Sequence, residues 1–149
     1  AIQSTQDPHA QYGLAQMILG GLINSNTNSM LELLRQVIEL LEESAKGGNE
    51  FAMFNLGIAH LYGYTGKPDQ SIAKSWFEMS GLPEGYIFVA ENLTNKITSK
   101  KYKDRAMKMG YGTEWRQLIR QHTGLGGAGG VDLNLPWPTL PNGQNPKKV

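Results

Sequence analysis

The chain has 149 residues, of which 40% are hydrophobic and 18% are charged, and it contains no cysteine. A chain of this length buries one ordinary core without a metal or a disulfide to hold it together. The absence of cysteine excludes disulfide scaffolds, thiolate metal sites and cysteine nucleophiles, and no apolar run approaches the ~18 to 20 residues of a membrane span.

The formal net charge of +1 conceals an uneven distribution of charged residues. Residues 1–94 carry 4 basic and 10 acidic residues, whereas residues 95–120 carry 8 basic and 2 acidic residues. The chain is therefore an electrostatic dipole. A near-neutral total argues against a dedicated nucleic-acid-binding protein, and opposed charged ends suit docking between partners of different sign.

Apolar residues up to about residue 123 recur three and four positions apart, which is the period of a helix, and no stretch alternates as a strand does. We expect seven helices. They are predicted from Pro8 (N-cap Asp7) to about Ile23, from Met30 to Ala45, from the N-cap Asn49 to Gly63 and Gly66, from Pro68 to Gly81, from Pro83 to about Leu93, from the N-cap Ser99 to Gly110, and onward from the N-cap Thr113.

The chain changes character at Gly124, where the run GLGGAGG begins and is followed by four of the seven prolines. We therefore divide it into a helical-repeat domain, residues 1–123, and an irregular, extended Gly/Pro-rich C-terminal tail, residues 124–149. The run has the letters of the GxGxxG dinucleotide motif, but it follows a predicted helix and precedes a segment that cannot be helical. A flexible hinge is the favoured interpretation.

The predicted helices repeat in pairs along the chain. The matching residues are Ala10, Leu14 and Gly21 with Ala52, Leu56 and Gly63, 42 positions later, and Val37, Leu40, Leu41 and Ser44 with Ala73, Trp76, Phe77 and Ser80, 36 positions later. A weaker third copy aligns Gly85 with Ala52 and Val89 with Leu56. Two helices per unit at this period are typical of an α-solenoid, in which each hairpin buries its apolar face against its neighbours.

One motif in residues 36–81 carries a family resemblance. It combines a small residue, Leu-Gly, two turn glycines, an aspartate, an alanine, an aromatic pair and a small pair: Ala52, Leu56-Gly57, Gly63, Gly66, Asp69, Ala73, Trp76-Phe77 and Ser80-Gly81, with Ser44-Ala45 as the preceding small pair. This pattern resembles the Sel-one-like repeat, a relative of the tetratricopeptide repeat. In the first unit Leu40-Leu41 replaces the aromatic pair, and in the third Lys96 replaces the turn glycine.

The resemblance implies an all-α fold, an α-α superhelix built as a short solenoid of helix hairpins with about 7 helices. Small residues such as Ala52 and Ala73 would let helix axes approach closely, and Trp76 would fill the gap between consecutive hairpins. Proteins of this family are mostly interaction platforms, in signalling or in building membrane-associated complexes. Their motif has no catalytic residue, so the resemblance implies an adaptor or assembly module.

The histidines His9, His60 and His122 lie far apart in the sequence, and no catalytic triad can be built from them. His60 has no carboxylate or second histidine three or four residues away, so a metal ligand is disfavoured. A half-buried histidine that lines the solenoid groove, together with Tyr62, is the favoured interpretation. We predict no catalytic residue, metal site or cofactor, and no enzyme activity.

The segment SKKYKDRAMK, residues 99–108, predicts an amphipathic helix with a cationic exterior, because its basic and apolar residues form two stripes about 100° apart. The basic face comprises Lys101, Arg105, Lys108 and Arg116. An ordinary solvated face is the simplest interpretation. Docking on an acidic protein surface or on anionic lipid headgroups is the alternative, and RNA is less favoured because the core occupies the aromatic residues.

The tail holds large apolar side chains that its prolines keep out of any helix or central strand, so it must run extended. We expect it either to fold back along the groove of its own solenoid or to lie on another subunit. Its predicted partner-binding residues are Leu133, Leu135, Pro136, Trp137, Pro138 and Leu140.

Two functional hypotheses follow. The first is a non-enzymatic interaction or scaffold subunit, an accessory subunit or assembly factor of a larger organellar or membrane-associated complex, whose partners are other protein subunits. Because the sequence opens at Ala1, we expect a processed product whose targeting segment has been removed, which favours an organelle. The second is a freestanding regulatory adaptor that binds peptides and carries an autoinhibitory tail.

Overall fold

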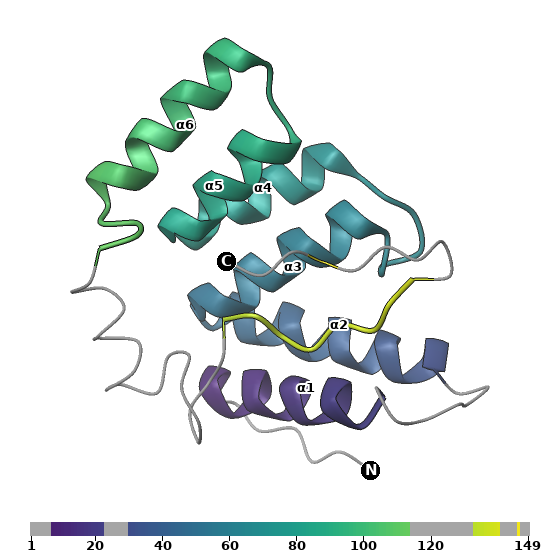
Figure 1. The fold of residues 1–149 in the computed structure, drawn as a ribbon. Helices are drawn as coiled ribbons and strands as arrows, with labels where there is room; N and C mark the ends of the chain where they lie inside the picture. Colours follow the sequence, from purple (N-terminus) through teal and green to yellow (C-terminus); the bar gives the residue numbers. More distant parts are fainter. Residues whose placement is uncertain (1–6, 23–29, 114–132, 141–145, 147–149) are drawn as a thin grey trace.

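A computed structural model of the chain describes residues 7–22, 30–113, 133–140 and 146. This part of the chain is all-helical, as the apolar period predicts, and contains six helices and no strand (Figure 1). The helices are α1 (Pro8–Leu22), α2 (Met30–Lys46), α3 (Glu50–Tyr62), α4 (Gln70–Ser80), α5 (Pro83–Asn92) and α6 (Lys96–Lys108).

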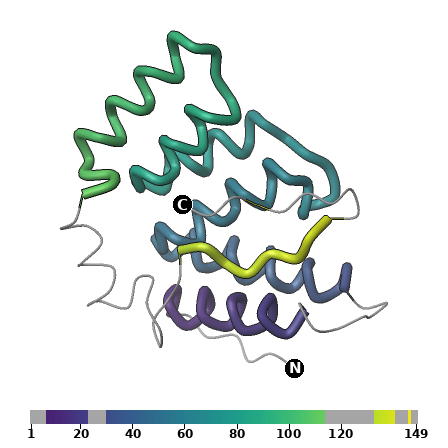
Figure 2. Tube along the Cα trace, viewed as in Figure 1, coloured from purple at the N-terminus to yellow at the C-terminus, as the bar shows by residue number. Residues whose placement is uncertain are grey.

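Consecutive helices pack on one another throughout the described part of the chain. The closest pairs are α1 with α2, α3 with α4 and α5 with α6, and α2 also packs on α3 and α4 on α5. The chain trace runs from α1 at the bottom of Figure 2 to α6 at the top, and residues 133–140 return as a yellow segment to the region of α1, α2 and α3. Helices that are neighbours in the sequence thus pack in pairs, and residues 133–140 return to the first two of these pairs.

Four predicted helix boundaries are confirmed. The side chain of Asn49 accepts a hydrogen bond at the start of α3, and Pro83 occupies the first turn of α5. Gly63 and Gly81 end α3 and α4 with left-handed backbone, at φ of 87° and 68°. Each of these residues acts through its own backbone or side chain, which is why the sequence alone located them.

The predicted start of the fourth helix is wrong. Asp69, not Pro68, borders α4, because its carboxylate accepts the backbone N–H of Ile72 at 3.0 Å. Pro68 instead lies in the loop against Gly63, where a Cβ would come within 3.0 Å of the proline ring. A proline before an aspartate is therefore a loop residue here rather than the first helical residue.

The predicted start of the sixth helix is also wrong. The side chain of Asn95 accepts the backbone N–H of Thr98 at 2.9 Å, so α6 begins one turn before Ser99. Both residues are good N-caps, and the one that stands first after α5 is used. The seventh helix, predicted onward from Thr113, falls outside the described residues, as does the domain boundary at residue 124.

Three phenylalanines form the centre of the core between the second and third helix pairs. The ring of Phe77 lies with its centroid 5.5 Å from that of Phe54 and 5.2 Å from that of Phe88. Gly57 makes room for it, because a Cβ at that position would lie 2.6 Å from the Phe77 ring. Phe77 is the buried residue that fills this gap, whereas Trp76 is half-buried and lines a pocket together with residues of α2, between the first and second helix pairs.

Candidate functional site

The described part of the tail, residues 133–140, folds back on its own helices and enters their core. Leu133, Leu135 and Trp137 are at most 5% exposed and belong to the same apolar cluster as the helices. Pro138 is also buried, whereas Pro136 and Leu140 are half-buried. In this structure of a single chain, residues 133–140 lie on their own helices, which is the first of the two predicted placements.

Asn55 of α3 is the polar centre of the tail contact. Its side chain is fully buried, and its Nδ2 lies 2.8 Å from the Leu133 carbonyl oxygen and 2.9 Å from that of Phe51. Its Oδ1 accepts a hydrogen bond from Trp137 Nε1 at 3.1 Å. An indole N–H can only donate and a carbonyl can only accept, so the partners fix the orientation of this amide.

Tyr12 of α1 closes the same network from the other side. Its hydroxyl donates to the Leu133 carbonyl oxygen at 3.3 Å and lies 2.9 Å from Asn55 Nδ2. The ring is fully buried. The first and third helices thus hold one main-chain carbonyl of the tail between two side chains, and each pairing removes the desolvation cost that an unpaired buried group would carry.

Tyr64, in the loop after α3, holds the second half of the tail. Its ring stacks on the Trp137 indole with centroids 4.7 Å apart and planes at 28°, and its hydroxyl donates to the Pro138 carbonyl oxygen. Burial, assisted by the neighbouring Tyr62, raises the pKa of the Tyr64 phenol to about 12. The raised pKa keeps the phenol protonated, and able to donate to the tail, up to a higher pH than an ordinary tyrosine.

Sequence reasoning found the tail side of this contact and missed the helix side. Asn55 carried a usable signal, because it lies between Phe54 and Leu56 in a run, residues 51–59, that is otherwise apolar. A buried polar side chain needs a partner, and an asparagine in such a position points to a bound main chain. Tyr12 and Tyr64 gave no comparable signal, since tyrosines at these positions also fit an ordinary core.

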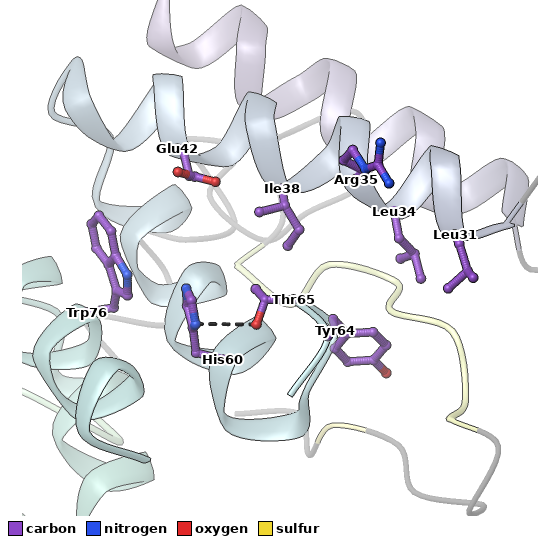
Figure 3. Close-up of a pocket in the computed structure, with 10 residues that line it drawn as sticks. Leu31, Leu34, Arg35, Ile38, Glu42, His60, Tyr64, Thr65 and Trp76 are labelled. Carbon is purple, nitrogen blue, oxygen red and sulfur yellow. Dashed lines mark hydrogen bonds between the residues drawn. The ribbon is translucent and has the colours of Figure 1, made fainter. Parts of the chain in front are cut away.

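A separate pocket of about 440 Å³ lies between α2, α4 and the loop after α3 (Figure 3). It is lined by Leu31, Leu34, Arg35, Ile38, Glu42, His60, Tyr64, Thr65, Gly66 and Trp76. Tyr64 is shared with the tail contact, so the two sites meet at this ring.

His60 lines this pocket, as expected of a groove residue, but Tyr62 does not. Tyr62 is half-buried and packs against the core instead. His60 Nδ1 forms a hydrogen bond of 3.4 Å with the Thr65 hydroxyl. Burial lowers the pKa of His60, and the negative charges of Asp69 and Glu42 oppose that shift.

The predicted basic face lies on α6. Lys101, Arg105 and Lys108 are exposed there, opposite the fully buried Ala106, and Arg116 falls outside the described residues. The Arg105 guanidinium lies 5.3 Å from the centroid of the Tyr86 ring. One of the three cations therefore packs on an aromatic ring as well as facing water.

A second aromatic contact joins α6 to α4. The Tyr102 hydroxyl donates to Glu78, and Lys74 Nζ lies 5.7 Å from the centroid of the Tyr102 ring. Burial, the hydrogen bond to Glu78 and the charge of that carboxylate, together with Tyr86, raise the pKa of Tyr102 to about 12. Glu78 thus places a negative charge beside the basic face and weakens the positive field of this surface.

The function of the site has to be inferred from its geometry, because the comparisons with known proteins found no match. No family model matches the chain, and no match was found among curated proteins or among solved structures. Among the described residues, no group of three or more histidines and carboxylates is placed to hold a metal ion. None of the described helices is long and apolar enough to cross a membrane.

Proposed function

We propose that the protein is a non-enzymatic protein–protein interaction module that binds extended peptide segments and regulates this binding with its own tail. The observation that carries the proposal is the buried contact of Asn55 with the main chain at Leu133 and with the indole of Trp137. Side chains that bind a main-chain carbonyl and one large side chain recognise an extended segment rather than a folded surface.

The helical part is proposed to be a short superhelix of helix hairpins related to the Sel-one-like repeat. Its support is the order of packing, in which each described helix contacts chiefly its neighbours along the chain, and the Leu-Gly motif, in which Gly57 admits the Phe77 ring. An array of this kind presents one continuous groove to a ligand.

The tether between the helices and the tail makes the contact regulatory. Because the tail and its site belong to one chain, the contact is intramolecular, and such linkage gives an effective concentration on the order of millimolar. A free partner segment must exceed this value, or bind better, before it replaces residues 133–140. The tail thus acts as an autoinhibitory segment, and a partner with a matching segment in high local concentration releases it.

A second candidate is the subunit of a larger assembly, in which the basic face docks on an acidic protein surface or on anionic headgroups. Apolar side chains on other faces favour it: Met17, Leu31 and Ile97 are 73%, 79% and 77% exposed. Such side chains gain most when a neighbouring subunit covers them. The native mass of the untagged protein from its source separates the candidates, because a free 16.4 kDa monomer excludes the assembly subunit.

The interaction module is tested by cutting the tether without removing the tail. A protease site is placed in residues 124–130, the purified protein is cut, and native mass spectrometry follows exchange with an isotope-labelled peptide of residues 131–146. We expect the cut tail to remain bound at first and then to exchange with excess labelled peptide. The exchange should be faster when the cut tail carries Trp137→Ala. If the tail never exchanges while the helices stay folded, the tail is a permanent part of the core, and the proposal is contradicted.

A further inference from the structure

The tail contact has a fixed spacing that defines a ligand. The groove binds the carbonyl of the residue at position 133, the indole four residues later and the carbonyl five residues later. Leu135, between the two anchored points, is buried in the core. A ligand must therefore be extended, and its tryptophan must stand four residues after the first bound carbonyl.

The indole N–H of Trp137 distinguishes tryptophan from other large aromatic residues in this groove. Asn55 Oδ1 is buried, and its partner in the tail is the Trp137 indole N–H. A phenylalanine would stack on Tyr64 equally well but would leave this oxygen without that donor. Sites that lose a buried hydrogen-bond partner discriminate strongly against the ligand that lacks it.

The prolines on both sides of Trp137 match the chemistry of the groove. Its described contacts with the main chain of residues 133–138 are donors to carbonyl oxygens, from Asn55, Tyr12 and Tyr64. Pro136 and Pro138 have no N–H, and the N–H of Trp137 is bound within the tail to the Leu135 carbonyl oxygen at 2.9 Å. Residues 136–138 thus bring no free main-chain donor into a groove that supplies donors.

We infer that the ligand of this groove is an extended Leu-x-Leu-Pro-Trp-Pro segment of a separate partner protein, of which residues 133–138 are the intramolecular copy. This inference rests on the proposed function and adds the specificity of the same site. Asn55 is the residue that reads the tryptophan, and Tyr64 clamps its ring against the groove. The flanking prolines exclude segments that would bring unpaired N–H groups.

The test uses the full chain carrying Trp137→Ala, which weakens its own tail, and labelled peptides of residues 131–142 in fluorescence anisotropy. The panel comprises the native peptide, a peptide with phenylalanine in place of Trp137, one with alanine in place of both prolines, and a scrambled peptide. We expect the phenylalanine peptide to bind about 10-fold or more weakly than the native one, because it leaves the oxygen of Asn55 unpaired. The alanine peptide should bind several-fold more weakly, and the scrambled peptide should not bind.

A second protein variant isolates the role of Asn55. With Asn55→Leu the oxygen is gone, so the native and phenylalanine peptides should bind equally, as a double-mutant cycle requires. If that variant fails to give the helical circular dichroism of the parent, Asn55→Asp replaces it. The aspartate keeps an acceptor for the indole and loses the donor for the carbonyl, so affinity should fall for both peptides while the preference for tryptophan persists.

The outcomes separate the inference from the proposed function. Equal binding of the native, phenylalanine and scrambled peptides would overturn the specificity and leave the interaction module standing. No binding of any peptide to the Trp137→Ala chain would overturn both. Dimers of the wild-type chain held by exchanged tails, seen in native mass spectrometry, would assign the groove to a second copy and overturn the separate partner.

Discussion

The groove that holds the tail and the basic face of α6 differ in burial and in charge. The groove is buried and its tail contacts are made by neutral side chains, and among the described residues no buried side-chain nitrogen or oxygen lacks a hydrogen-bond partner. The basic face is exposed, and the contact of its Arg105 with an aromatic ring lies at the surface. The binding proposed for the first would depend on geometry and resist salt, whereas docking on the second would act through a field that is screened within about 8 Å at physiological ionic strength.

Removal of the tryptophan should break the groove most severely. Trp137→Ala deletes a 5% exposed side chain, its stacking on Tyr64 and its bond to Asn55, with an expected cost of about 3–5 kcal/mol. Hydrogen exchange measured by mass spectrometry should show loss of protection in residues 133–140. The control is Thr139→Ala, an exposed position of the same segment, which should change stability by less than about 0.5 kcal/mol. Unchanged protection in Trp137→Ala would remove the tryptophan from the anchoring role.

Replacing the Asn55 amide with a carboxylate should have the next largest destabilising effect on the tail contact. Asn55→Asp keeps the shape and the acceptor but faces the Leu133 carbonyl with a second acceptor, at an expected cost of about 1–3 kcal/mol in urea unfolding. Asn92→Asp is the matched control, because Asn92 donates to a carbonyl four residues earlier, as Asn55 does, at 3.0 Å. Equal losses in the two variants would show that only the local helix bond matters.

A milder change tests the second carbonyl contact. Tyr64→Phe removes the hydroxyl that donates to the Pro138 carbonyl and keeps the stacked ring, so we expect a loss of about 0.5–1.5 kcal/mol. Tyr62→Phe, at the last residue of α3, serves as the control. Thermal unfolding of both variants measures the difference, and a loss confined to Tyr62→Phe would contradict the clamp.

The basic face should respond to charge and salt, and not to the packing changes that affect the tail contact. Neutralising Lys101 and Lys108 to glutamine is expected to change the free energy of unfolding by less than about 0.5 kcal/mol, because both side chains are exposed. Protection of residues 133–140 should not change. Any binding of acidic partners should weaken as salt rises, and a loss of tail protection in this variant would join two regions that we treat as independent.

The smallest expected effect is the pH response of the pocket that His60 lines. Burial lowers the folded-state pKa of His60 below its ordinary 6.5, so between the two values the unfolded chain binds more protons than the folded one. This contribution to stability is present above pH 6.5 and declines as the pH falls through the folded-state pKa. Melting temperatures at pH 7.5 and 5.5 should fall more for the wild type than for His60→Gln, and equal falls would remove His60 from this response.

Several helix boundaries were predictable because one residue acts alone at each of them. Asn49, Gly63, Gly81 and Pro83 were located from the sequence because a cap or a left-handed turn depends on the residue that forms it. The error at Ser99 arose where two good caps stood within one turn, and the choice between them depends on where α5 ends. Local chemistry therefore predicts the elements and leaves some starts to packing.

What the sequence determined by itself is the helical period, most of the caps and an extended tail, since each depends on residues close along the chain. The place of the tail was decided by tertiary structure, because its partners Tyr12, Asn55 and Tyr64 are separated from it by 121, 78 and 74 positions. Main-chain carbonyls carry no residue identity, so no pattern in the sequence pairs them with a distant asparagine. Only the folded helices bring the donors together at the spacing that the tail fits.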